Sequence, residues 1–316
     1  MSRYRLVPSA AQEVILRGHC AHARYVWNLA VEQQSWYGMA GRKAAPGWVA
    51  QLTEARAGSR WLAAGSQMVL QQALRDFGQA MANFFAGTHR QPAWRKARRD
   101  EGFRIVAVKP ERIRRLSRKV AAVRVPEAGW VRFRLSRPVP EGVRSCRVTP
   151  DTAGCWHIAF AAVADPVPGP GTGEVVGVDR GVAVSAALST GEMLTVARLS
   201  PARRARLVVL HRKLARAKRG PNRRARTTTV LARIQAREAD VRKDWCEKAS
   251  TGLARRFDVI CVEDLSITNM TRTAKGTIAA AGTNVRQESG LNREIRRSGW
   301  GLLVRRAEDK APGRVQ

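Results

Sequence analysis

Two short apolar segments of the sequence end in acidic side chains, and these acids could do chemistry. The run VVGVDRG (175–181) delivers Asp179 after a series of valines, and DVICVEDL (258–265) delivers Glu263 and Asp264. Side chains alternate along a strand, so Asp179 lies on the face opposite Val176 and Val178. Glu263 and Asp264 must point to opposite faces, so only one of them can share a site with Asp179.

Carboxylates at the ends of two strands of one domain could hold divalent cations and let a phosphodiester approach. Gly177 would leave room beside Asp179, and Gly181 would let the backbone bend just after it. Metal-dependent cleavage of phosphodiesters uses two cations about 4 Å apart, which need several carboxylates to neutralise them. The plainer interpretation is a helix cap at Asp179 and a surface acid on the second segment, and the basic context favours the metal site.

The charge of the chain indicates a polyanionic partner. There are 57 Lys and Arg against 25 Asp and Glu, a net charge of +32 and a pI near 11.6. Such an excess repels itself in a compact fold unless a polyanion neutralises it. A genome rich in G and C could explain why Arg outnumbers Lys, but it does not explain the net charge.

Two stretches carry all of the predicted nucleic-acid contacts. Residues 90–119 contain twelve Lys or Arg against three acids, with Trp94 and Phe103 between them, and residues 201–245 contain fifteen against three. These one-sided ratios favour phosphate binding over a merely solvated face. The predicted contact residues are Arg95, Lys96, Arg98, Arg99, Arg203, Arg204, Arg212, Lys213, Arg216, Lys218, Arg219, Arg223, Arg224 and Arg226.

The first ninety residues are expected to form a short strand and a small helical bundle. Residues 3–7 read as a strand, and Ser9 with Gln12 forms a capping-box pattern that opens a helix. Apolar residues then recur at helical spacing and predict one buried face. They are Leu16, Cys20, Ala23, Trp27 and Ala30.

A second helix is expected from about Ser66 to Phe85, after a turn-rich patch around Gly38–Gly47. We expect Trp27 and Trp36 in the core rather than as stacking platforms for bases.

From Gly102 to Val163 the pattern changes to short alternating runs separated by Pro and Gly. The runs are RIVAV, KVAAVRV, WVRFRL, RSCRV and WHIAFAAV. They predict a compact antiparallel barrel or sheet that residues 3–7 would join, with the helices as an insertion.

The segment after Asp165 is rich in Pro and Gly and reads as a linker. Valine-rich strands and long basic helices follow, which is typical of an α/β layer fold. A helix hairpin is expected across residues 201–245, broken at Gly220-Pro221-Asn222.

No apolar run resembles a signal peptide or membrane span. The five cysteines are scattered, without a C-x-x-C pair, which suits a reducing cytoplasm and gives no zinc knuckle.

The sequence resembles the TnpB/OrfB family of transposon-encoded proteins, relatives of the compact type V CRISPR effectors. The resemblance covers nearly the whole chain through six blocks in the family's usual order. They are RYRLVPSAAQ, ARYVWNLAVEQ, SCRVTPDTAGCWHIAF, VVGVDRG, VICVEDLSITNM and LNREIRRSGWGLLVRRAEDKAPG.

This resemblance implies a multidomain α+β and α/β protein. It implies a wedge-like β-barrel over residues 1–8 and 90–165 and a helical recognition insert over 9–89. A linker over 166–173 and a RuvC-like nuclease domain of RNase H fold over 174–316 would follow.

The resemblance also implies the chemistry. Asp179 and Glu263 match the family's first two catalytic acids and would bind Mg²⁺ or Mn²⁺. The implied activity is metal-dependent cleavage of double-stranded DNA chosen by a guide RNA from the transposon end. The resemblance also implies a role in the retention and spread of the transposon, historically labelled transposase. We expect a cytoplasmic, nucleoid-associated bacterial or archaeal protein that binds RNA as a monomer.

The chain departs from the family pattern at its end. Members continue into a zinc knuckle and a third catalytic Asp, whereas this sequence stops at Gln316 and Asp309 is its last acid. We therefore expect a C-terminally truncated chain with no zinc and with weak or no nuclease activity. The alternatives are an RNA-guided DNA binder that does not cut, and a basic RNA-packaging protein without target choice.

Overall fold

The computed structural model describes residues 2–39, 48–99, 101–163, 165–218, 220, 222–273 and 282–316. The chain divides into two compact units, Met1–Ala164 and Asp165–Gln316. Each unit has its own hydrophobic core.

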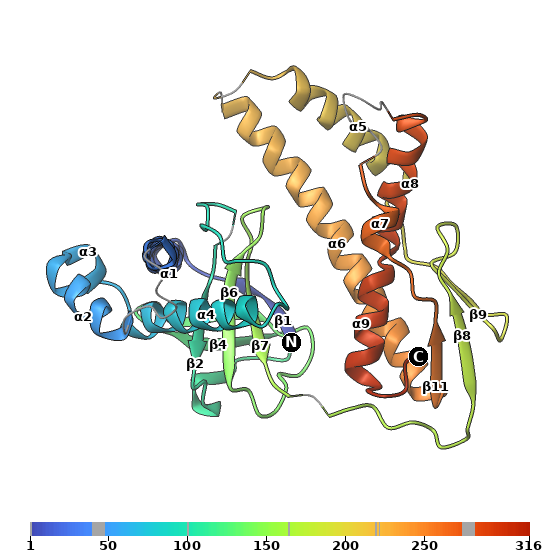
Figure 1. Ribbon diagram of the computed structural model, residues 1–316, viewed down its shortest axis with the longest axis horizontal. Coiled ribbons are helices and arrows are strands. Elements are labelled where there is room, and N and C mark those ends of the chain that lie inside the picture. The colour runs from blue at the N-terminus through green and yellow to red at the C-terminus, as the bar shows by residue number, and fades with distance from the viewer. Residues whose placement is uncertain are drawn as a thin grey trace. The chain divides into compact units, whose positions relative to one another are not determined.

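The first unit combines helices with a large antiparallel sheet (Figure 1). Its helices are α1 (Ala10–Met39), α2 (Trp48–Gly58), α3 (Arg60–Ala63) and α4 (Gln67–Phe85), with a 3-10 turn at Pro110–Arg112. Its strands are β1 (Ser2–Val7), β2 (Phe103–Val106), β3 (Ile113–Arg115), β4 (Val120–Val125), β5 (Gly129–Arg134), β6 (Ser145–Pro150) and β7 (Trp156–Ala161).

The seven strands lie in the order β2-β6-β7-β1-β5-β4-β3. Strand β1 pairs with β7 on one side and with β5 on the other, so the first residues of the chain occupy the centre of this sheet. Helices α1 to α4 therefore lie in sequence between β1 and the remaining strands. The order is open, with β2 and β3 at its edges, so hydrogen bonding between the described strands does not close a barrel.

Helix α1 begins with the expected capping box. The Gln12 amide donates to Ser9 Oγ at 3.2 Å, and the Ser9 amide donates to Gln12 Oε1 at 3.1 Å. These two bonds satisfy backbone donors that have no partner inside the helix. All five residues of the predicted apolar face are buried, as expected: Leu16, Cys20, Ala23, Trp27 and Ala30.

Helix α4 packs against α1 and β2 and contributes Phe77 and Met81 to the core.

Two expectations for the end of α1 were wrong. Trp36 is largely exposed rather than buried, because it lies beyond the part of α1 that contacts the core. Gly38 lies inside α1, and positions 40–47 of the predicted turn-rich patch fall outside the described residues.

The second unit contains a small mixed sheet and several helices (Figure 1). Its strands are β8 (Val175–Asp179), β9 (Ala186–Leu188), β10 (Met193–Leu194) and β11 (Val259–Val262). Its helices are α5 (Pro201–Arg216), α6 (Asn222–Arg256), α7 (Ile267–Met270), α8 (Val285–Ser298) and α9 (Trp300–Lys310). Among the helices in the described ranges, none combines the length and apolar character needed to cross a membrane.

These four strands follow the order β10-β9-β8-β11. Strands β10, β9 and β8 pair antiparallel, whereas β8 and β11 are parallel. The last residues of the chain continue the sheet beyond β11. The Ile260 amide donates to Arg314 O at 2.8 Å, the Gln316 amide donates to Ile260 O at 2.9 Å, and the two segments run parallel.

Helices α6 and α9 lie side by side and cover one face of this sheet (Figure 1). Val176 and Val178 of β8 are buried against Leu253 and Leu303 of these helices. The alternation of β8 therefore directs its valines to the covered face and its other residues to the opposite face.

Helices α5 and α6 form the expected hairpin. Leu207 and Leu231 are buried between them, and Leu210, Leu214 and Ile234 pack around that pair. The break falls between Arg216 and Asn222, as Gly220 predicts. Helix α6 extends to Arg256, well past the expected end of the hairpin.

Candidate functional site

The two acids singled out in the sequence lie at neighbouring positions of the second sheet. Parallel pairing aligns Val178 of β8 with Val262 of β11. Asp179 and Glu263 each follow the aligned valine, so both carboxylates leave the same end of adjacent strands. Adjacent strands lie about 4.8 Å apart.

Both acids belong to the face that α6 and α9 leave uncovered. Val176 and Ile260 are fully buried on the helix-covered face, and Asp179 and Glu263 are exposed. Asp264 is exposed as well, one residue further along and therefore out of phase with this pair. The geometry makes Asp179 and Glu263 the pair most able to share a ligand.

Arg180 is a further residue of this site that the sequence reasoning missed. Its side chain is 6% exposed, and Nη2 donates to the backbone oxygen of Glu263. Burial lowers the pKa of this guanidinium, and the carboxylates of Glu263, Asp264 and Asp179 act in the opposite direction. Its Nε has no hydrogen-bond partner in the described part of the chain.

Arg180 thus ties the end of β11 to the end of β8 and places a positive charge near all three acids. The sequence offers only a partial signal, which is that Arg180 directly follows the strand-terminal acid Asp179. A cation directly after a strand-terminal acid points to the face opposite that acid.

The two glycines beside Asp179 differ in whether the fold requires them. A Cβ at Gly181 would meet the backbone oxygen of Val184 at 2.9 Å, so the turn after Asp179 needs a glycine there. A Cβ at Gly177 would meet only Ser189, at 3.6 Å, which is ordinary contact. Gly177 is therefore not required to make room beside the carboxylate.

The chemistry of the donors fits a hard divalent cation. Mg²⁺ is usually held by one or two carboxylates, with water and substrate phosphate completing its shell. Within the described ranges, no cluster of three or more His, Cys, Asp or Glu side chains could hold a metal ion. Asp179 and Glu263 thus supply two carboxylate ligands rather than a closed all-protein cage.

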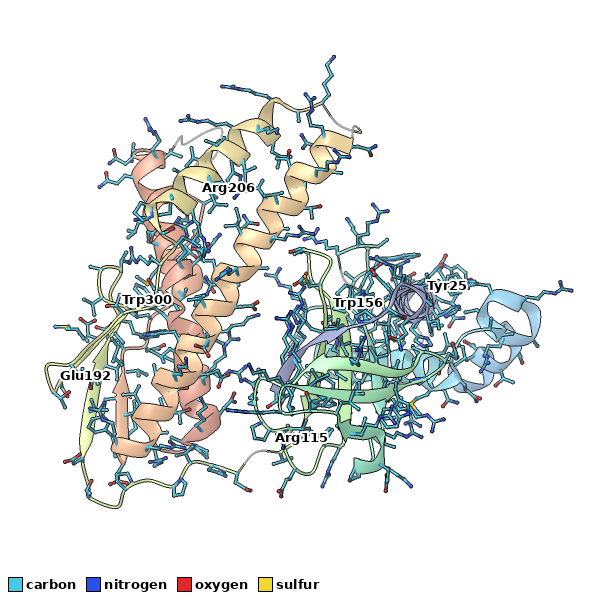
Figure 2. All side chains as sticks on the ribbon, turned by 180° about the vertical axis from the view of Figure 1, so that it is seen from behind. Tyr25, Arg115, Trp156, Glu192, Arg206 and Trp300 are labelled. Carbon is cyan, nitrogen blue, oxygen red and sulfur yellow. The ribbon has the colours of Figure 1, made fainter. Side chains whose placement is uncertain are left out.

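Most of the basic residues predicted on the hairpin are exposed. Figure 2 shows nitrogen-bearing side chains along α5 and α6, among them Arg206. The exposed predicted residues here are Arg203, Arg204, Arg212, Lys213, Arg216, Lys218, Arg223 and Arg226. Arg224 differs, because its Nη1 donates to Leu214 O and Ala217 O, both at 2.7 Å, and so caps the end of α5. Arg219 lies outside the described residues.

The predicted residues that follow α4 are Arg95, Lys96, Arg98 and Arg99. Lys96, Arg98 and Arg99 are exposed. The Arg95 guanidinium lies 3.6 Å from the ring centre of Trp27 and is half-buried. Its side chain is therefore held against α1 by a cation–π contact.

A third basic surface lies in the first unit and was not predicted as a site. A groove of about 670 Å³ is lined by Arg115, Arg118, Lys119, Arg134 and Arg137. Arg115 is labelled in Figure 2. These residues come from β3, β5 and their neighbouring loops, so only the pairing of the strands brings them together.

The sequence matches two profiles of one group of protein families. A family profile described as "Probable transposase" (OrfB_IS605) matches residues 157–274, which contain both Asp179 and Glu263. A second profile of the same group, described as "Helix-turn-helix domain", matches residues 2–43.

Among solved structures, the chain has a loose likeness to one titled "Cryo-EM structure of CRISPR-Cas12f Ternary Complex". The TM-score is 0.37 and the identity 11%, over 95% of this chain and 70% of that one. A TM-score this low supports no argument about this chain.

Two curated relatives match over most of their length. "Putative RNA-guided DNA endonuclease InsQ" of Escherichia coli (strain K12) is 30% identical over 94% of this chain and 74% of the relative. "Putative RNA-guided DNA endonuclease" of Streptomyces pristinaespiralis is 31% identical over 86% of this chain and 68% of the relative. With these relatives and both OrfB profiles, the chain belongs to the TnpB/OrfB family of transposon-encoded proteins.

Proposed function

We propose that this protein is an RNA-guided DNA endonuclease whose hydrolytic site is formed by Asp179 and Glu263. The observation that carries the proposal is the parallel register of β8 and β11, which aligns Val178 with Val262 and leaves the two acids side by side. The names of the two relatives support the same activity.

The arrangement of the second sheet supports a RuvC-like nuclease of RNase H fold for residues 174–316. Three antiparallel strands are followed by the parallel strand β11, and a further parallel segment pairs beyond it. Asp179 is the last residue of β8, and Glu263 directly follows β11, the parallel neighbour of β8. We extend the proposal to a wedge-like domain over 1–8 and 90–165, a helical recognition insert over 9–89 and a linker over 166–173.

Asp179 and Glu263 would hold Mg²⁺ or Mn²⁺ through their carboxylate oxygens. Such a cation polarises a phosphoryl oxygen and lowers the pKa of bound water. The protein's own contribution is positional. Arg180 fixes the end of β11 through the Glu263 carbonyl, and the close approach of Val184 O requires glycine at position 181, two residues after Asp179.

The exposed cations of the α5–α6 hairpin would contact the phosphates of the guide RNA or of the target DNA. Phosphate contacts position a nucleic acid without reading its sequence. In RNA-guided systems, the sequence is read by base pairing with the guide.

The proposal is tested with protein co-purified with the RNA expressed from its flanking transposon DNA. The target is a plasmid library that carries the guide-matched sequence beside randomised flanking bases, incubated with Mg²⁺. Weak cleavage is expected in the wild type, whose site offers two acids, and Asp179→Asn or Glu263→Gln should reduce its rate by about a hundredfold or more, because metal-assisted charge stabilisation contributes several kcal/mol.

Asp309→Asn is the matched control. Asp309 is an exposed acid that pairs with Arg306 at 2.7 Å on α9, away from the two strand ends. This variant should cut like the wild type. Cleavage that survives in Asp179→Asn would overturn the assignment of the site. Target binding without cleavage in every variant would instead favour an RNA-guided DNA binder that does not cut.

A further inference from the structure

Three exposed aromatic side chains gather around one pocket of the first unit, whereas the proposed hydrolytic site belongs to the second. The pocket has a volume of about 240 Å³ and is lined by residues of α1, of α3 and of the loop after α4. Tyr25, Trp61 and Trp94 are 47%, 46% and 54% exposed. Tyr25, on α1, is labelled in Figure 2. A group of exposed aromatic rings around a concave surface marks a binding site rather than a core.

Trp94 is held in place by its neighbours while its own ring stays exposed. Trp27 Nε1 donates to Ala93 O at 3.0 Å. The Arg95 amide donates to Asn28 Oδ1 at 2.8 Å, and Asn28 Nδ2 donates to Arg95 O at 3.1 Å. The backbone on both sides of Trp94 is therefore hydrogen-bonded to α1. As a result, the indole should lose little conformational entropy when a ligand binds.

The opposite side of the pocket is also preorganised. The rings of Tyr25 and Trp61 meet edge to face, with their centres 5.3 Å apart. His22 packs against Trp61 with ring centres 4.3 Å apart, and its Nε2 lies 3.0 Å from Trp61 O. These contacts fix the Trp61 ring beside the open part of the pocket.

One polar side chain in the lining has no partner among the described residues. Glu32 lines the pocket from α1 and makes no side-chain hydrogen bond or ion pair with any residue that the structure describes. Arg24, in the same lining, is paired with Glu101 at 2.6 Å. The pocket thus offers aromatic faces for stacking together with a carboxylate that accepts hydrogen bonds.

We propose that this pocket binds a single unpaired guanine base of a nucleic acid. The base would stack on Trp94 or Trp61 and donate its N1–H and N2–H to the Glu32 carboxylate. Among the standard bases, guanine presents two adjacent N–H donors on its Watson–Crick edge, which match the two oxygens of a carboxylate. This inference rests on the proposed function, which makes nucleic acid the natural ligand of the chain.

Size and surrounding charge agree with this occupant. Pockets for small ligands usually measure about 300 to 1,000 Å³, so a pocket of about 240 Å³ suits one base and not a longer segment. Lys96 follows this segment and is exposed, where it can contact a neighbouring phosphate. Unpaired bases in single strands are commonly recognised by stacking on aromatic rings with hydrogen bonds to their Watson–Crick edge.

The test measures binding of short fluorescent oligonucleotides to the full chain by anisotropy. Each is a run of uridines with a central guanine, adenine or inosine, made as RNA and, with thymidines, as DNA. We expect the guanine oligonucleotide to bind about tenfold more tightly than the adenine one. Inosine lacks the N2 amino group and should fall between them. A guanine preference in either series supports the proposal, and the series with the larger preference identifies the nucleic acid.

Four variants locate the effect. Trp94→Ala should weaken binding of the guanine oligonucleotide by about tenfold or more, as is typical when a stacking ring is removed. Glu32→Gln should abolish the preference for guanine over adenine while it leaves the ring contacts intact. Two control variants should change neither the affinity for the guanine oligonucleotide nor the preference for guanine over adenine. They are Trp36→Ala, at an exposed tryptophan of α1 outside the pocket lining, and Glu54→Gln on α2.

Equal affinity for all central bases would overturn the pocket assignment while the proposed function stands, because guided cleavage needs no base preference here. No binding to any oligonucleotide would overturn both. A trimethyllysine peptide that competes with the oligonucleotide, when guanosine monophosphate does not, would also overturn the guanine assignment. Such a result would identify an aromatic cage for a quaternary ammonium group.

Discussion

At the scale of single residues, the turn after Asp179 is the most constrained part of the candidate site. Gly181 carries the bend, its carbonyl accepts a hydrogen bond from Trp300 Nε1 at 3.2 Å, and Arg180 beside it reaches the Glu263 carbonyl. Arg180 and Gly181 are therefore connected to three elements. The loop holds β8, β11 and the start of α9 together.

Gly181→Ala is expected to lower the free energy of unfolding by about 1 to 3 kcal/mol, because the new methyl group would overlap Val184 O. It should also reduce cleavage by displacing Asp179. Gly177→Ala is the matched control, since its Cβ would make only ordinary contact with Ser189, at 3.6 Å. Thermal unfolding and the plasmid assay measure both effects. Equal stability of the two variants would contradict the role given to Gly181.

The sequence anticipated part of this site. The ends of the two valine-rich strands identified Asp179 and Glu263 because alternation and apolar runs are local properties. Arg180 was missed because its function depends on the carbonyl of a residue 83 positions away. The pocket of Tyr25, Trp61 and Trp94 was missed for the same reason, since α1, α3 and a loop meet there only in the folded chain.

At the scale of elements, Arg314 links the end of α6 to the segment that precedes β8. Its Nη1 donates to Ala254 O and Phe257 O at 3.2 and 3.0 Å, and its Nη2 donates to Val167 O at 2.6 Å. The last carbonyls of a helix have no partner inside the helix, so a forked cation there acts as a cap.

Arg314→Ala should therefore destabilise the end of α6 by about 2 kcal/mol, the usual value for hydrogen bonds to a charged group. Arg314→Lys should recover only part of this, because an ammonium cannot reproduce the planar fork. Hydrogen–deuterium exchange of peptides from the end of α6 measures the change. Arg255→Ala, an exposed cation in the same helical turn, is the control and should cost about 0.5 kcal/mol or less. Equal effects of Arg314→Ala and Arg255→Ala would refute the cap.

Element prediction succeeded where the signal was local and periodic. The capping box at Ser9 and the apolar face of α1 are examples, as are the five alternating runs that became β2 and β4 to β7. It failed for β3, which has only three residues and no alternation of its own. Arg224 reads as one more cation of a basic run, although the fold uses it to cap α5.

At the scale of the whole molecule, burial in the two hydrophobic cores determines which cysteine thiols are protected from chemical modification. Burial raises the pKa of Cys20 and Cys146 to about 12 and that of Cys246 to about 11. Thiolate is the reactive form, so these three thiols should remain unreactive at pH 8. Cys155 and Cys261 are partly exposed.

A thiol reagent at pH 8 should therefore modify only Cys155 and Cys261 rapidly in the folded chain. Unfolding in guanidinium chloride should release the other three, because an unfolded thiol has a pKa near 8.5. Peptide mapping after a short reaction time identifies the labelled positions. Rapid labelling of Cys20 or Cys146 in the native protein would contradict the packing of the first unit.

The length of helix α6 limits how much nucleic acid can lie along the α5–α6 hairpin. Its 35 residues span about 52 Å at 1.5 Å per residue. The phosphates of one strand recur about every 3.4 Å along the axis of duplex DNA, so a duplex whose axis is parallel to this helix would present about fifteen of them per strand. Deleting one helical turn would shorten the helix by about 5.4 Å and remove one or two nucleotide steps from the length it can follow.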